Sequence, residues 1–181
     1  MNRKFFSLAA VTVIGGFAVA VAPQMAWAQV TGFGSAGWKQ GVDNYWPAHA
    51  SGRYIQSARN YAQSVQTYMA KATKPEPSVV KEIKTELGRY LDDGQKHLAT
   101  MKKDFANDKE AASAIDGIEK ELTTAISQNR EMIACCENQA FDKIATMSCC
   151  SDLVKQLDKV HADHVALMRK LATKDATQAA K

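Results

Sequence analysis

The chain has 181 residues, a hydrophobic fraction of 46% and a formal net charge of +4 at pH 7, with only four cysteines. Such a small net charge, with basic and acidic residues interspersed, argues against a nucleic-acid partner and against an anionic membrane surface. The length suits one domain that can bury a core without obligatory disulfides. The cysteines are therefore expected to have a role other than stabilising the fold through disulfides.

Residues 1–28 have the regions of a secretory signal peptide. Arg3 and Lys4 form a positive start, residues 5–22 are largely apolar, and an Ala-Trp-Ala cleavage site ends at Ala28. Sec-type cleavage after Ala28 would leave a net charge of +2 and no further stretch that could span a membrane. The alternative is a retained anchor, since the apolar run is long enough to span. Cleavage predicts a periplasmic or secreted protein with no membrane attachment.

Residues 29–50 do not have a helical pattern. Four glycines punctuate the segment, and only Lys39 could supply the basic neighbour that a nucleic-acid stacking surface needs. We therefore expect an irregular N-terminal arm whose aromatic side chains dock on the rest of the domain. These aromatic side chains are Phe33, Trp38, Tyr45 and Trp46.

Residues 51–173 carry four apolar stripes at helical spacing, and no segment alternates as a strand does. The first stripe comprises Tyr54, Ala58, Tyr61, Val65, Tyr68 and Ala72. The second comprises Val80, Ile83, Leu87, Leu91, Leu98 and Met101. The third comprises Ile115, Ile118, Leu122, Ala125, Asn129, Met132 and Cys136, and the fourth Leu153, Leu157, Val160, His164, Leu167 and Leu171.

Short connections between these segments predict an all-α fold, an up-down-up-down antiparallel four-helix bundle. Pro75 and Pro77 end the first helix, Ser78 is the expected N-cap of the second, and Asn107-Asp108 marks a turn. An elongated coiled coil is the alternative, but the four segments and their stop signals favour the compact bundle. Residues 174–181 lose the pattern and are expected to fray.

The start of the fourth helix is the open point, because no Gly or Pro lies between residues 134 and 152. In one interpretation Asn138 caps a helix that begins at about Gln139 and runs through Cys149 and His164. In the other, residues 141–147 form a separate short element and Ser151 caps the last helix. The two interpretations place the cysteines differently.

The cysteines form two adjacent pairs, Cys135-Cys136 and Cys149-Cys150. In an exported protein, disulfides between the pairs are the default, whereas thiolates with the thioethers of Met132 and Met147 would form a soft metal site. An unbroken helix from Gln139 would place Cys149 about 15 Å from the helix start, too far to bridge to Cys136. Disulfides therefore require the broken helix or a partner chain.

His161 and His164 lie three residues apart and share one side of the last helix with Asp158. Two imidazoles and a carboxylate make half of a zinc, copper or iron site, but histidines hydrogen-bonded between helices are the equal alternative. If the last helix starts near Gln139, His97 and His49 join them at one end of the bundle. Asp93, Asp116 or Glu119 would then be within reach.

Motifs for covalent haem, di-iron sites, phosphate loops and serine hydrolases are absent from the sequence, so an enzyme is the less favoured class. In architecture the heptads, cysteine pairs and Asp158-x-x-His161-x-x-His164 resemble exported four-helix metal-handling bundles in general. The sequence thus predicts a non-catalytic protein that binds a transition metal, copper first and zinc second. The alternative is a structural or protein-interaction bundle with two disulfides and no metal.

Overall fold

A computed structural model describes residues 42–179 of the chain, and these residues form four α-helices without a strand. The helices are α2 (Val42–Lys71), α3 (Pro77–Asp104), α4 (Lys109–Glu137) and α5 (Lys143–Ala179). The all-α prediction is confirmed. The predicted signal peptide and most of the predicted arm lie outside the described residues. No described helix is both long enough and apolar enough to cross a membrane.

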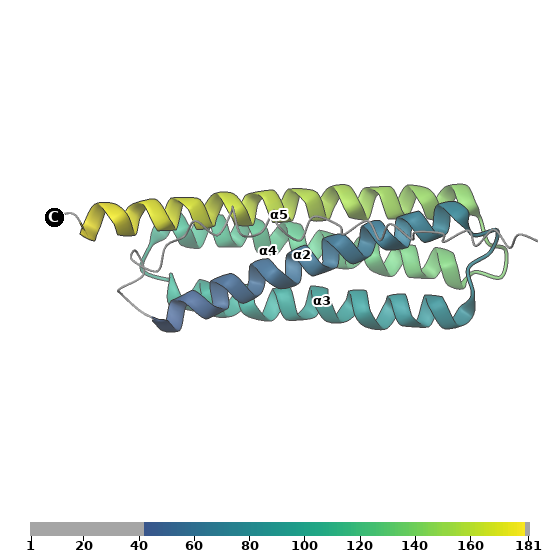
Figure 1. The fold of residues 1–181 in the computed structure, drawn as a ribbon, viewed down its shortest axis with the longest axis horizontal. Coiled ribbons are helices and arrows are strands. Elements are labelled where there is room, and N and C mark those ends of the chain that lie inside the picture. The colour runs from purple at the N-terminus through teal and green to yellow at the C-terminus, as the bar shows by residue number, and fades with distance from the viewer. Residues whose placement is uncertain (1–41, 180–181) are drawn as a thin grey trace, which may run out of the picture. The chain divides into compact units, whose positions relative to one another are not determined.

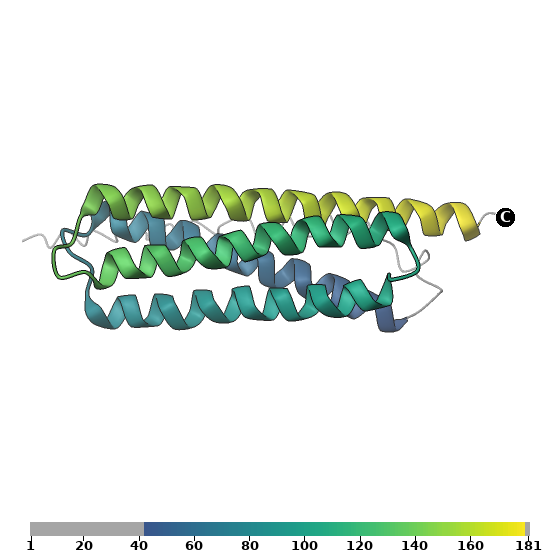
Figure 2. The ribbon, with the colours of Figure 1, turned by 180° about the vertical axis from the view of Figure 1, so that it is seen from behind.

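The four helices pack side by side (Figures 1 and 2). Helix α2 contacts α3 and α5, and α4 contacts the same two helices. The three connections are short: residues 72–76, 105–108 and 138–142. At one end, Lys143 Nζ donates to the carbonyl of Ala72, and at the other Lys174 pairs with Asp108. These contacts link α5 to the two connections that lie beside it.

The core follows the predicted stripes in three of the four helices. All predicted stripe residues of α3, α4 and α5 are buried, including the polar Asn129 and His164. In α2 the predicted Ala58 and Val65 are buried, but the three tyrosines are not, because Ile55, Ala62 and Met69, each one position later, occupy the core in their place. The tyrosines are only half-buried, and their ring edges and hydroxyls stay at the boundary: the Tyr68 hydroxyl, for example, accepts a hydrogen bond from the Glu76 amide.

The starts of α2 and α3 and the end of α5 differ from the predictions. Helix α2 begins at Val42, directly after the last glycine of the arm, and so includes residues 42–50. Helix α3 begins at Pro77 with Glu76 at the N-cap, not at Ser78, because the fixed backbone of proline suits the first helical turn. At its other end α5 continues to Ala179, beyond the predicted end at residue 173.

Helix α5 begins at Lys143 and is continuous, so the broken-helix interpretation was wrong and the start at Gln139 was four residues early. Asp142 caps it, since its carboxylate accepts hydrogen bonds from the amides of Ile144 and Ala145 at 2.8 and 3.1 Å. Asn138 instead ends α4 and accepts a hydrogen bond from the Ala140 amide in the connection. A carboxylate cap thus fixes the start of the helix that carries both the second cysteine pair and His164.

Candidate thiol and histidine sites

The four cysteines meet where the end of α4 packs against the beginning of α5. Cys135 Sγ and Cys149 Sγ lie 3.7 Å apart, a weak thiol hydrogen bond. Both of these side chains are half-buried, whereas Cys136 and Cys150 are buried in the core. We call these four side chains the thiol cluster. Two of its thiols are therefore close to the surface and two are inside.

Burial makes the inner thiols weak acids. It raises the pKa of Cys136 to about 11 and that of Cys150 to about 12, and the neighbouring thiols add to both shifts. The pKa of Cys149 is also raised, by burial first and then by its hydrogen bond to Cys135. The inner pair is thus neutral at pH 7, and a metal would have to displace protons to bind there.

The meeting of the two pairs contradicts the prediction that an unbroken helix keeps them apart. Measured along the helix axes, Cys149 lies about 9 Å after the start of α5, and Cys135 lies about 3 Å before the end of α4. Connection 138–142 takes up the difference of roughly 6 Å, because it lets α5 begin beyond the last turn of α4. The two pairs are therefore level with each other without a break in the helix.

The disulfides of the alternative prediction are not found in the structure. All four cysteines are free, and the 3.7 Å between the sulfur atoms of Cys135 and Cys149 far exceeds a bond of about 2.05 Å.

The two methionines lie close in sequence to the cluster: Met132 is buried one turn before Cys136, and Met147 is half-buried one turn before Cys150. Each therefore shares a helix face with an inner thiol.

His164 lies farther along α5, in contact with the first turns of α2. Its Nε2 atom lies 2.8 Å from Ser51 Oγ and 3.1 Å from the Ala48 carbonyl oxygen. The Ser51 hydroxyl donates to the same carbonyl at 2.9 Å, so its proton is used there. Nε2 accordingly carries the ring proton and donates to both oxygens. That nitrogen is not available to a metal.

The other side of the His164 ring is closed by Gly52. A Cβ atom built on Gly52 would lie 2.7 Å from Cε1 and 3.0 Å from Nδ1 of His164, so only glycine leaves room for the ring. Burial lowers the pKa of His164 to about 4, although the hydrogen bond to Ala48 acts in the opposite direction. His164 is therefore a neutral core histidine held by three residues of α2.

His161 and His49 lie near His164, and their positive charges, when they are protonated, would repel a protonated His164. Burial lowers the pKa of both, and for His161 the positive charge of Arg59 adds to this effect. Arg59 also forms an ion pair with Asp158. The predicted Asp158-x-x-His161-x-x-His164 half-site thus has its carboxylate neutralised by an arginine and its last histidine occupied by α2.

His97 makes a different contact. Its ring stacks on Tyr54, with centroids 5.3 Å apart and an angle of 8° between the ring planes. The carboxylates suggested as its neighbours are engaged elsewhere, since Asp93 pairs with Lys96 while Asp116 and Glu119 pair with Lys102. Across residues 42–179 as described, no three His, Cys, Asp or Glu side chains are placed to hold a metal ion.

The thiol cluster and the histidines are separate sites, as predicted. Cys149 and His161 lie on one continuous helix, about 18 Å apart along its axis. Ser51 and Gly52, the partners of His164, were not predicted from the sequence. The signal for them was a small polar residue and a glycine together inside an amphipathic helical segment, where neither is expected from helix propensity.

Comparison of the chain with protein-family models, with curated proteins and with solved structures finds no match. Function is therefore inferred from the geometry of the chain's own residues.

Proposed function

We propose that this protein is an exported four-helix bundle that binds Cu(I), without turnover, at the thiol cluster. The observation that carries the proposal is the 3.7 Å separation of Cys135 Sγ and Cys149 Sγ. Two thiolates bound to one metal at about 2.3 Å lie roughly 3.8 Å apart at a tetrahedral angle and roughly 4.0 Å apart at the wider angle of a three-coordinate ion. The outer thiols are therefore already spaced as two ligands of one ion.

Copper is favoured over zinc by the number of donors at hand. Structural zinc needs four ligands in tetrahedral geometry, and no group of three donors is in place among the described residues. Cu(I) is satisfied by fewer, soft donors, and thiolate with thioether is the combination that selects it. Cys135 and Cys149 supply the first two, while Cys136, Cys150, Met132 and Met147 are the candidates to complete the site.

The inner thiols set the pH dependence of binding. Because Cys136 and Cys150 have raised pKa values, they bind as thiolates only by releasing protons to the solvent. Affinity for Cu(I) therefore falls as the pH is lowered. Neutral thiols also keep an empty site free of buried charge, which would otherwise destabilise the bundle.

The histidines are left out of the proposed site. His164 Nε2 is bonded to α2, Asp158 pairs with Arg59, and His97 stacks on Tyr54. Zinc remains the second choice for the thiol cluster itself, if all four thiolates turn toward one ion.

The rest of the proposal concerns the context of this site. The signal-peptide pattern of residues 1–28 supports export to the periplasm or medium, with the segment up to Gly41 as an aromatic arm. The three short connections, with the contacts of α5 at both ends, support an up-down-up-down order of the helices. In such a bundle the metal site lies at one end, between consecutive helices.

The test is an anaerobic titration of the reduced protein with Cu(I) against a chromophoric Cu(I) chelator. We expect one tightly bound ion, thiolate-to-copper charge-transfer absorption and loss of reactive thiols. The double variant Cys135→Ser/Cys149→Ser should weaken binding at least 100-fold, since it removes both preset ligands. The control is His161→Gln, which removes a donor on the same helix and should leave the affinity unchanged.

Two results would overturn the proposal. Four oxidised cysteines in protein purified from the exported fraction, with no copper bound after reduction and reconstitution, would favour the structural bundle with disulfides. Equal Cu(I) affinity in the double variant would place the copper elsewhere in the chain.

A further inference from the structure

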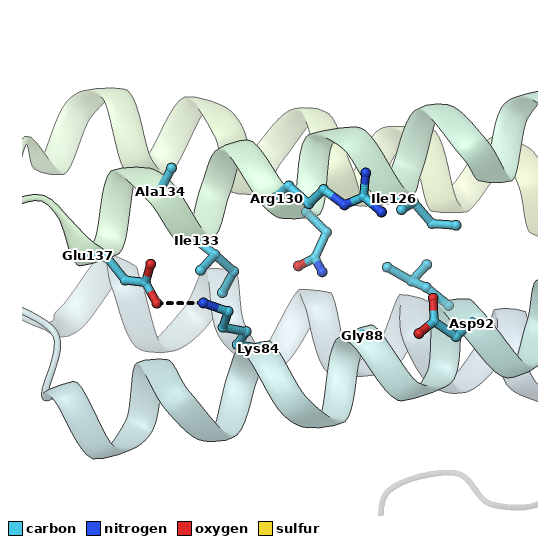
Figure 3. Close-up of a pocket in the computed structure, with 10 residues that line it drawn as sticks. Lys84, Gly88, Asp92, Ile126, Arg130, Ile133, Ala134 and Glu137 are labelled. Atoms are coloured by element: carbon cyan, nitrogen blue, oxygen red, sulfur yellow. Dashed lines mark hydrogen bonds and ion pairs between the residues drawn. The ribbon is translucent and has the colours of Figure 1, made fainter.

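A cavity of about 340 Å³ opens between α3 and α4, apart from the thiol cluster (Figure 3). One face of each helix lines it, with residues at helical spacing between positions 84 and 92 of α3 and between positions 126 and 137 of α4. Its volume falls at the lower end of the range for small-molecule sites, which begins at roughly 300 Å³.

Asn129 supplies a buried polar group to the wall of the cavity. Its side chain is only 6% exposed, and its Oδ1 atom has no hydrogen-bond partner among the described residues. The neighbouring walls are aliphatic, from Leu91, Ile126 and Ile133. A buried acceptor without a partner costs about 1–3 kcal/mol, so a ligand that donates to Oδ1 recovers this energy.

Gly88 keeps the cavity open on the side of α3. A Cβ atom built on it would meet nothing within 4 Å, so no close contact requires a glycine there. Glycine inside a helix costs about 1 kcal/mol relative to alanine. Its consequence here is empty space in the α3 side of the cavity wall.

The charges around the cavity are of both signs and only partly paired. Lys84 and Glu137 form an ion pair of 3.0 Å at one end, visible in Figure 3. Arg130 and Asp92 line the cavity from opposite helices, and neither forms an ion pair with any residue of the described range. One unpaired guanidinium and one unpaired carboxylate therefore face the same cavity.

We propose that this cavity binds a free amino acid with an aliphatic side chain. Arg130 would receive the carboxylate, and Asp92 with Asn129 Oδ1 would accept from the ammonium group. The aliphatic side chain would pack on Leu91, Ile126 and Ile133 in the space that Gly88 leaves. The site is independent of the metal site, because it uses none of the cysteines.

The test is a titration of the full exported protein with L-leucine, followed by amide chemical shifts and by calorimetry. We expect saturable binding with the shifts centred on Gly88 and Asn129. Two probes that each lack one charged group, 4-methylpentanoate and leucinamide, should bind at least 10-fold more weakly. Each removes one ligand charge that Asp92 or Arg130 would meet.

The variant Gly88→Leu fills the cavity and should abolish binding while the helix keeps a good helix former. The matched control is Gly117→Leu, because among the described residues Gly117 is the other helical glycine whose Cβ would meet nothing within 4 Å. It should bind leucine as the wild type does, and the unfolding midpoint of both variants reports whether they fold. Absence of leucine binding in the wild type, binding that persists in Gly88→Leu, or equal affinity for all three probes would overturn the proposal.

Discussion

Helix α5 contributes to two groups of polar side chains, the His164 contacts with α2 and the thiol cluster with α4, and these differ in how they are satisfied. His164 has two acceptors, Ser51 Oγ and the Ala48 carbonyl oxygen, and a matching glycine arranged around it, all from α2. The thiol cluster has a single weak sulfur–sulfur contact of 3.7 Å, and its two inner members are neutral. One group is held in a single geometry by strong contacts, and the other is held mainly by packing.

The difference separates a structural role from a ligand-binding one. A histidine with its Nε2 proton shared by two oxygens would lose both hydrogen bonds if that nitrogen bound a metal. Thiols lose little when they leave a weak contact for a metal. Residue type alone makes the histidines and the cysteines equal candidates for metal ligands. Only the hydrogen bonds that each side chain makes distinguish them.

The largest expected effect is the pH dependence of the free energy of unfolding that His164 causes. The pKa of His164 is about 4 in the folded chain and 6.5 as its reference value, so the unfolded chain takes up this proton first as the pH falls. Its stabilising contribution is present above pH 6.5 and is lost between pH 6.5 and 4. A shift of this size corresponds to about 3 kcal/mol. Urea unfolding of the wild type and His164→Gln at pH 7 and pH 4 measures it.

The wild type should lose about 3 kcal/mol more than His164→Gln between these two pH values. The lowered pKa values of His49 and His161 act in the same direction but remain in both proteins, so they cancel in the comparison. Equal losses would mean that the ring is not held neutral by its burial.

The thiol cluster predicts a difference in reactivity among its members. At pH 8 a thiol with a pKa near 11 has a thiolate fraction about 100-fold lower than one at the reference value near 9. Cys136 and Cys150 should therefore be alkylated at least about 100-fold more slowly in the folded protein than in urea. The half-buried Cys135 and Cys149 should react first. Quenched labelling followed by mass spectrometry of the peptides resolves the four sites, and similar rates for all of them would contradict the inner–outer division.

Much of the fold could be predicted because the spacing of apolar residues along a helix can be read from a single segment of the sequence. The stripes of α3, α4 and α5 need only the positions of residues such as Leu87, Leu122 and Leu157 along one helix. The predicted stripe of α2 was right at Ala58 and Val65 and wrong at its tyrosines, because a tyrosine side chain is amphipathic. Their hydroxyls and ring edges favour the boundary, and Ile55 fills the core beside them.

The sites depended on relations between helices, which no local pattern contains. Whether Cys135 meets Cys149 depends on the connection at residues 138–142 and on the cap at Asp142. Asn129 fell on a predicted stripe, but its missing partner is visible only when α3 is in place. Residue types could therefore be selected from the sequence, while their contacts could not.

The smallest effect concerns the glycine that makes room for the histidine. Gly52→Ala would place a Cβ atom 2.7 Å from Cε1 of a ring that is bonded to Ser51 and Ala48. Overpacking of this kind costs about 1–3 kcal/mol, partly offset by the better helix propensity of alanine. We expect a net loss of about 1–2 kcal/mol in the free energy of unfolding, measured by urea denaturation.

Gly117→Ala is the matched control, because the same substitution there meets nothing within 4 Å. It should stabilise the protein by up to about 1 kcal/mol through helix propensity alone. The loss at Gly52 should also shrink when His164→Ala is added, since the ring that causes the clash is then gone. If the two glycine variants were equally stable, the His164 ring would be free to move aside. The histidine would then be as loosely held as the thiols, and the distinction between His164 and the thiol cluster would fail.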